Sequence, residues 1–431
     1  MTMGPPGWTP RLQAKAYGEV HEAGERARQV SVQLRGLDRA ARDKALLVLA
    51  DALTGRREEI LEANRADLAR APEDENLLRE LTLDGRRIDD LAYEMRTLAA
   101  LPDPLGEVVH GMRQRSGLRR AQVRAPIGVI AVLHEGMPWV LPHAAGMLLK
   151  TGNAVLLHDA KGFAAATDEA LARIIRDALN TGAVPPDAVQ LIPSTHKAAV
   201  RYLLGAEEHV DLVIPLLPRG IPAQMLPEAR VPILRLGRGG GHIYVDAEAD
   251  VELAQQIVCD SKIGYASFPH TATTVLVHAE IARKLVPGLH QALLDNGVAI
   301  HADERFAALA PGCPPATEDD WRADGPSAVL AAAVVDTLGD ALTHIDTYGT
   351  GHTETVVTGD PAVVRRFTTQ VDAATITVNA PITLTDPSSN PLDPALAYST
   401  QRLRPRGPLG LQELTSTKWL VWASGQGFDL D

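Results

Sequence analysis

Apolar residues recur every three or four positions through the first hundred residues, which is the spacing of amphipathic helices. The segments 37–53 and 56–70 show this pattern clearly. The region 11–100 is therefore predicted to be helical.

After that region, short apolar runs alternate with longer amphipathic segments. The pattern predicts strands over 123–132, 153–157, 188–192 and 210–215, with helices over 138–150 and 164–180 between them. A second block has a helix over 253–265 and strands over 273–278, 298–301, 328–335, 353–358 and 375–378. Strands separated by helices of this length are typical of parallel βαβ units, so an α/β fold is predicted. The tail 416–424 has a strand pattern without a following helix and is expected to pair with a neighbouring sheet.

Length and charge narrow the classes of protein. A chain of 431 residues is expected to form roughly two or three domains. Its net charge of -12 argues against nucleic acid or an anionic membrane as the main partner, but leaves small anionic substrates open. The start of the chain lacks a secretory pattern, and no apolar run reaches roughly 18 residues, so a cytoplasmic protein is expected. Cys259 and Cys313 are too few for a disulfide framework or a cysteine-type zinc site, and no metal site is predicted.

The run Ser267-Phe268-Pro269-His270-Thr271 lies at the turn between a predicted helix and a buried strand. Such a turn is a common place for an exposed nucleophile on a rigid frame. Pro269 has no acidic side-chain atom and no backbone N–H, so it can neither attack a carbonyl nor donate to an oxyanion. His270, beside it, is a candidate general base.

His134 and Glu135 directly follow a buried strand. Both could face a cleft at its carboxyl end, where open α/β sheets bind ligands, and either could act as a general base. The alternative is a structural pair with no part in catalysis.

Three other features have two readings each. The glycine-rich run 235–242 enters a strand rather than a helix, which favours a hinge over a phosphate cradle. The basic run 402–408, with Arg404 and Arg406, could bind a carboxylate or phosphate, or brace a subunit interface. Cys259 falls inside a predicted helix, which favours a buried inert thiol over a displaced nucleophile.

Six runs of the chain are collinear with those of one known family. They are RAPIGVIAVLHEGMP (124–138), LLKTGNAVLL (148–157), GRGGGHIYVDAEAD (237–250), TTVLVH (273–278), GTGHTETVVTGD (349–360) and STQRLRPRGPLGLQELTSTKW (399–419). Together they resemble the γ-glutamyl phosphate reductases, also called glutamate-5-semialdehyde dehydrogenases, of the aldehyde dehydrogenase superfamily. The resemblance extends over roughly residues 10–425.

The resemblance implies an aldehyde-dehydrogenase-like architecture. A Rossmann-like cofactor domain with N-terminal helices would span 1–248, with a β-arm near 108–124. An α/β catalytic domain would span 249–385, and a return segment with an oligomerisation strand would span 386–431. In the family, a cysteine attacks γ-glutamyl phosphate to form a thioester, an asparagine stabilises the oxyanion, and NADPH then supplies hydride. A homo-oligomer, dimer or tetramer, is expected.

The chain departs from the family at the residues that carry this chemistry. The nucleophile position is Pro269, and the asparagine position is Trp139. Leu217 and Pro218 stand where the family has a glycine-rich turn, leaving Gly220 as a doubtful cofactor residue, and the late run 390–395 lacks the family glutamate. Lys161 does match the family lysine after the cofactor-domain strand, so the adenosine end of NADP could still be held. Four candidates for substrate binding are Arg404, Arg406, Asn379 and His352.

A lost nucleophile removes the thioester pathway altogether, whereas a lost oxyanion donor costs about 10²–10³ in rate. The leading hypothesis is therefore a repurposed non-redox enzyme. It would bind an acyl phosphate or similar activated acid, and an amine or hydroxyl would attack directly with His270 or Glu135 as base. One alternative is a non-catalytic scaffold for a glutamate-kinase-like partner. The other is a weak NADP-linked reductase using direct hydride transfer.

Overall fold

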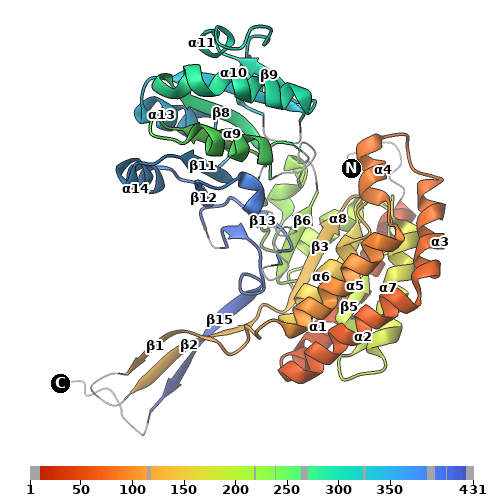
Figure 1. The fold of residues 1–431 in the computed structure, drawn as a ribbon. Coiled ribbons are helices and arrows are strands. Elements are labelled where there is room, and N and C mark those ends of the chain that lie inside the picture. The colour runs from red at the N-terminus through yellow and green to blue at the C-terminus, as the bar shows by residue number, and fades with distance from the viewer. Residues whose placement is uncertain are drawn as a thin grey trace. The chain divides into compact units, whose positions relative to one another are not determined.

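The computed structural model describes residues 10–113, 118–217, 220–237, 239–263, 270–323, 327–385, 394–403 and 405–423. The chain forms two compact units, which Figure 1 shows together. The first comprises residues 1–235, 394–397 and 409–431, and the second comprises 236–393 and 398–408. Among the described residues, no helix has the length and apolar character that a membrane crossing requires.

The first unit begins with five helices, as the apolar periodicity predicts. They are α1 (Pro10–Leu34), α2 (Arg39–Gly55), α3 (Arg57–Leu68), α4 (Glu75–Leu81) and α5 (Gly85–Ala100). The start of α2 is fixed by the Asp38 side chain, which accepts a hydrogen bond from the Ala41 amide at 2.8 Å. Its buried face includes Leu46, Leu49 and Leu53, at three- and four-residue spacing.

A four-stranded parallel sheet forms the centre of the first unit. Its elements are β3 (Val129–His134), α6 (Val140–Lys150), β4 (Ala154–Asp159), α7 (Ala165–Leu179), η1 (Pro186–Ala188), β5 (Val189–Leu191), α8 (Ala198–Gly205), β6 (Leu212–Leu216) and η2 (Ala223–Glu228). The strand order is β5-β4-β3-β6. Every residue of β3 and β4 is buried, which explains why these strands are continuous apolar runs rather than alternating ones.

The single strand predicted over 123–132 is in fact two strands in different sheets. β2 (Arg119–Pro126) pairs antiparallel with β1 (Val108–Arg113) and with β15 (Thr415–Trp422), whereas β3 lies in the parallel sheet. The chain turns at Gly128, whose φ of +138° favours glycine. A Cβ there would also overlap the Asp211 carboxylate. The predicted tail strand is β15, and its partner is β2.

The second unit contains a six-stranded parallel sheet, whose strand order is β12-β11-β7-β8-β10-β9. The helices and strands of the unit are β7 (Gly241–Val245), α9 (Val251–Asp260), β8 (Ala272–His278), α10 (Ala279–Asp295), β9 (Ala299–Ala302), α11 (Glu304–Ala307), α12 (Glu318–Trp321), β10 (Val329–Val335), α13 (Leu338–Tyr348), β11 (Thr353–Val357), α14 (Pro361–Gln370), β12 (Thr375–Val378), η3 (Ile382–Thr385), β13 (Tyr398–Ser399) and β14 (Gly407–Pro408).

The two compact units divide the chain differently from the predicted regions. Residues 236–248 were placed with the first region by the resemblance, but β7 pairs with β8 and β11 in the second unit's sheet. Backbone pairing across the sheet therefore moves this segment to the second unit. Helices α9 and α10 pack with this sheet into one apolar core, which includes Ile243, Ile257 and Leu285.

Candidate functional site

His134 and Glu135 leave the end of β3 in different surroundings. His134 is fully buried, and its Nε2 lies 3.2 Å from a carboxylate oxygen of Asp168 on α7. Glu135 is partly exposed, and one of its carboxylate oxygens lies 3.3 Å from the Lys161 ammonium. His134 thus lies in the interior rather than at a surface cleft, because its side chain turns onto the crossover helix. Glu135 is the member of the pair that solvent reaches.

Asp159 fixes the turn that carries Lys161. This aspartate is the last residue of β4, and it accepts hydrogen bonds from the amides of Lys161 at 3.0 Å and Ala164 at 2.7 Å. The backbone of the turn is therefore rigid, while the Lys161 side chain is 48% exposed. Such a lysine could contact an anionic group from solvent, although Glu135 already neutralises part of its charge.

Trp139 stands at the start of α6 and contacts other residues of the first unit. The guanidinium of Arg87 lies 5.4 Å from the centre of the indole ring, a cation–π arrangement. The indole N–H is buried and donates no hydrogen bond to any described residue. One turn further along α6, His143 pairs with Glu94. Burial would lower the pKa of His143, but the Glu94 carboxylate outweighs it and raises that pKa.

Gly220 occupies a tight turn after β6. Its φ is +62°, and its amide donates to the Leu217 carbonyl at 2.9 Å. Leu217, which the resemblance sets against the family's glycine-rich turn, is partly exposed. Pro218 lies outside the described residues.

In the second unit, three residues form one buried aromatic cluster. His270 and His352 are predicted site residues, and Tyr398 is not. The rings of His270 and His352 meet edge to face with centroids 4.8 Å apart, and His352 stacks on Tyr398 at 3.8 Å. All three are at most 9% exposed. The Tyr398 hydroxyl pairs with Thr375 and donates to the His352 carbonyl at 3.2 Å. Tyr398 was not anticipated, because its strand β13 is only two residues long.

Burial decides the protonation of His352. It lowers the pKa of His352 to about 3, with His270 adding to the effect, so His352 is neutral at pH 7. Its Nε2 is buried and has no hydrogen-bond partner among the described residues. His270 Nδ1 lies 3.5 Å from the Thr385 hydroxyl. The cluster therefore places the two imidazoles in contact. Pro269, where the resemblance puts the family's nucleophile, lies outside the described residues.

The other predicted substrate-binding residues serve the second unit's own structure. Both amide atoms of Asn379 bond to the backbone of Thr358, at 2.9 and 3.0 Å. Arg406 pairs with Asp372 at 2.7 Å. These contacts join loops of the unit and leave neither side chain fully available to a ligand. Arg404 lies outside the described residues.

One cluster of three possible metal ligands was not predicted from the sequence. His134, Asp159 and Asp168 offer one ligand atom each within 4.8 Å of one another, and all three are buried. The spacing of 25 and 9 residues gives no motif, so the group becomes visible only when the strand register is known. Burial raises the pKa of Asp168, and the nearby His134 counteracts this effect.

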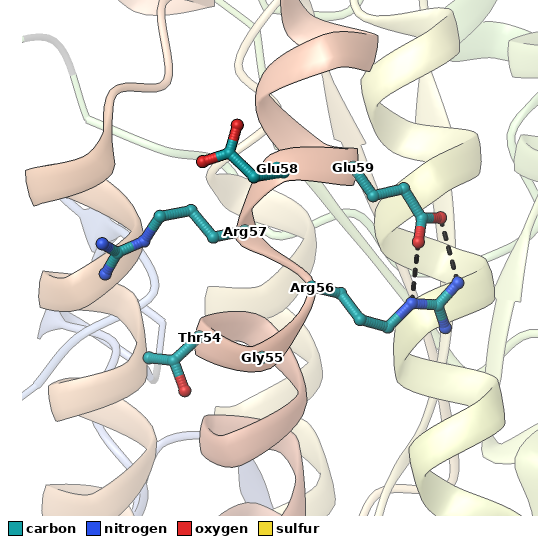
Figure 2. Close-up of a pocket in the computed structure, with 6 residues that line it drawn as sticks. All are labelled: Thr54, Gly55, Arg56, Arg57, Glu58 and Glu59. Atoms are coloured by element: carbon teal, nitrogen blue, oxygen red, sulfur yellow. Dashed lines mark hydrogen bonds and ion pairs between the residues drawn. The ribbon is translucent and has the colours of Figure 1, made fainter.

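A surface hollow at the junction of α2 and α3 offers less. It is lined by Thr54, Gly55, Arg56, Arg57, Glu58 and Glu59. Figure 2 shows that Arg56 and Glu59 point toward each other on one side, whereas Arg57 and Glu58 lie on the other. Arg57 also pairs with Asp89. Since its arginines are already matched by carboxylates, the hollow is a solvated surface rather than an anion site.

The sequence of this chain is similar to those of known proteins. The family model described as "Aldehyde dehydrogenase family" matches residues 9–305. The γ-glutamyl phosphate reductase of Thermobifida fusca (strain YX) is 40% identical over 410 residues, covering 94% of this chain and 98% of the relative. That of Moorella thermoacetica (strain ATCC 39073 / JCM 9320) is 40% identical over 411 residues, covering 95% of this chain and 98% of the relative.

A solved structure agrees with these relatives. The crystal structure of the γ-glutamyl phosphate reductase of Thermotoga maritima has a TM-score of 0.89 and 33% identity, and the match covers 95% of this chain and all of that one. The resemblance inferred from the six sequence runs and the predicted α/β fold are thereby confirmed. The chain belongs to the aldehyde dehydrogenase family.

Proposed function

We propose that this protein acts on an acyl phosphate of the γ-glutamyl phosphate class without forming a thioester. An amine or hydroxyl would take the acyl group directly. The proposal rests on the surroundings of the two cysteine thiols, since the sequence contains no other thiol.

Both thiols are packed against the apolar core of the second unit. Cys259 lies on α9, Cys313 lies in the loop before α12, and each is partly buried beside that core. Burial raises the pKa of both thiols. A thiolate is the attacking species in thioester formation, so a partly buried thiol with a raised pKa is a poor nucleophile.

The acyl phosphate class comes from the relatives. They are named for γ-glutamyl phosphate, and the chain matches them over almost their whole length. An acyl phosphate already has a good leaving group, so transfer to an amine needs neither a thiol nor hydride. The C–N bond forms, the C–O bond to phosphate breaks, inorganic phosphate leaves, and the amine loses one proton.

His270 is the proposed acceptor of that proton. Its ring lies beside the neutral His352, directly after the family's nucleophile position. His352 is neutral at pH 7 and so places no positive charge beside His270. Glu135 is the second candidate base, and its ionised carboxylate is held by Lys161.

The family also implies NADP, and the described residues fit it poorly. The turn before Gly220 carries the Leu217 side chain, which hinders close approach of the backbone to a phosphate. Lys161, which could contact a phosphate, is paired with Glu135. The proposed reaction accordingly has no hydride step.

The test supplies the protein with γ-glutamyl phosphate, made in place from glutamate and ATP by a glutamate kinase. A panel of amines and alcohols is added, and acylated products are measured by mass spectrometry against a blank without the protein. We expect one acceptor class to give product well above the blank. Product equal to the blank for every acceptor would overturn the proposal and favour the scaffold alternative. NADPH oxidation coupled to phosphate release would favour the reductase.

Two histidine variants test the role of the base. His270→Asn should lower the rate by about 10²–10⁴, the usual contribution of a general base. His278→Asn is the matched control, because His278 lies at the end of β8 and caps α10, and asparagine can also cap a helix. Equal rates for both variants would exclude His270 as the base.

A further inference from the structure

We infer that His134, Asp159 and Asp168 form a binding site for one divalent transition-metal ion inside the first unit. The inference does not depend on the proposed function. It rests on the geometry of three buried side chains and on the missing hydrogen bonds of two of them.

The fold brings these residues together through strand register. His134 is the last residue of β3, Asp159 is the last of β4, and the two are direct partners in the parallel ladder. Asp168 lies in the first turn of α7, the helix that follows β4. The three ligand atoms lie within 4.8 Å of one another at the carboxyl ends of the strands, where α/β sheets commonly place their ligands.

The surroundings of the Asp168 carboxylate are a second, independent observation. Its side chain is 2% exposed, and neither carboxylate oxygen accepts a hydrogen bond from a described residue. His134 Nε2 lies 3.2 Å from one of these oxygens as an ion-pair contact, and that nitrogen has no geometric hydrogen-bond partner among the described residues. A buried carboxylate without hydrogen bonds is costly, so such groups usually bind an ion or share a proton.

Other charges near the site do not satisfy Asp168. Asp67 is also buried, but it accepts from the amide and hydroxyl of Thr167 and pairs with the exposed Arg70. Asp159 is held by backbone amides, which leaves lone pairs on its carboxylate. Two carboxylates with a neutral imidazole would balance the charge of one divalent cation.

The donor set identifies the class of ion. One imidazole nitrogen and two carboxylate oxygens suit zinc and neighbouring first-row ions better than calcium or magnesium, which prefer oxygen alone. The ion would tie the ends of β3 and β4 to the start of α7. It would thereby stiffen the turn that presents Glu135 and Lys161.

The experiment uses the full chain, dialysed against a chelator and then titrated with Zn²⁺. We expect one Zn²⁺ per chain by elemental analysis and calorimetry, with a higher thermal midpoint in its presence. Co²⁺ should bind competitively and give visible absorption bands of a nitrogen- and oxygen-ligated ion. Asp168→Asn should weaken Zn²⁺ binding by more than about 100-fold, since even residues behind the ligands contribute about 10–100-fold.

Matched variants separate this site from other histidines. His21 and His209 form an exposed pair with ring nitrogens 3.0 Å apart, which is a plausible adventitious chelator. The double variant His21→Ala/His209→Ala should keep the full Zn²⁺ stoichiometry. If it loses the bound Zn²⁺, or if the unaltered chain binds none, the inference is overturned and the trio is only an ion pair. Circular dichroism shows whether an Asp168→Asn variant that loses Zn²⁺ is still folded. The parallel variant Asp159→Asn tests a second ligand of the same site.

Discussion

The buried amine of Lys262 contributes to the pH dependence of this protein's stability. Lys262 is fully buried, and its ammonium donates to the Ala272 carbonyl at 2.8 Å. Burial lowers the pKa of Lys262 to about 8 from the usual 10.5. The described residues place no carboxylate beside it to offset this desolvation. The folded state therefore binds this proton less tightly than the unfolded chain does.

The sign of the effect follows from linkage. Between pH 8 and about 10.5 the unfolded chain holds more protons at this position, so the free energy of unfolding rises with pH. Below pH 8 the charged amine costs the folded state roughly 3 kcal/mol. Urea denaturation should show a midpoint that increases from pH 8 to pH 10, with a smaller increase for Lys262→Met. Lys284→Met, at an exposed position on α10, should keep the slope of the unaltered protein. An identical slope for Lys262→Met would contradict the account.

At the same scale, some residues could be interpreted from sequence and others could not. The resemblance implies that Pro269 stands at the family's nucleophile position, and the choice of the neighbouring His270 followed from it. The inward direction of the His134 side chain could not be predicted, because the apolar pattern ends this strand near residue 132, whereas His134 is the last residue of β3. The role of Asn379 in ligand binding stays a prediction, and its amide bonds to the Thr358 backbone, which the sequence pattern does not show.

At the scale of elements, Gly128 decides where one strand ends and another begins. Its positive φ and the adjacent Asp211 carboxylate leave no room for a side chain. Asp211 also accepts from the Val129 amide at 2.8 Å and pairs with Arg28 at 2.8 Å. The sequence pattern missed this break because the apolar run continues through it, whereas the sheets on either side differ.

Two alanine substitutions test this element-scale argument. Gly128→Ala should lower the free energy of unfolding by at least about 2 kcal/mol, because it combines backbone strain with displacement of Asp211. Gly18→Ala should raise it by about 0.5–1 kcal/mol, since Gly18 lies within α1 and an added Cβ there meets nothing within 4 Å. Denaturant titrations of both variants give the comparison. Equal effects would show that the break at Gly128 is not constrained.

The group His134–Asp159–Asp168 also belongs to this scale. Residues 134, 159 and 168 share no sequence motif, and they meet because β3 and β4 pair in a particular register. Apolar patterning predicted both strands but carries no information about register between two fully buried strands. A metal site was therefore not predicted.

At the scale of the whole molecule, the two α/β blocks and the family could be predicted from periodicity and from the six sequence runs. The assignment of β7 could not, because it depends on which sheet its backbone joins. The expected homo-oligomer remains a proposal. It is supported by the β1-β2-β15 sheet, which exposes Val109, Met112, Trp419 and Val421.

A charge placed on that sheet tests the proposed association. Val421→Lys should shift the protein toward a smaller oligomer, since a lysine within an apolar interface is costly to desolvate. Light scattering after size-exclusion chromatography measures the mass. Ala362→Lys, at an exposed position on α14, serves as the control and should leave the mass unchanged. An unaltered mass for Val421→Lys would argue against this sheet as the interface.

The central claim is that this family member processes an acyl phosphate without using a thiol. The direct measurement is the rate of acyl transfer from γ-glutamyl phosphate by the double variant Cys259→Ser/Cys313→Ser. Because both thiols are packed against the core, and the proposed reaction uses neither as a nucleophile, we predict a rate within about twofold of the unaltered protein. Loss of the reaction in a variant that still folds, or a substrate-derived thioester on Cys259 by mass spectrometry, would contradict the claim.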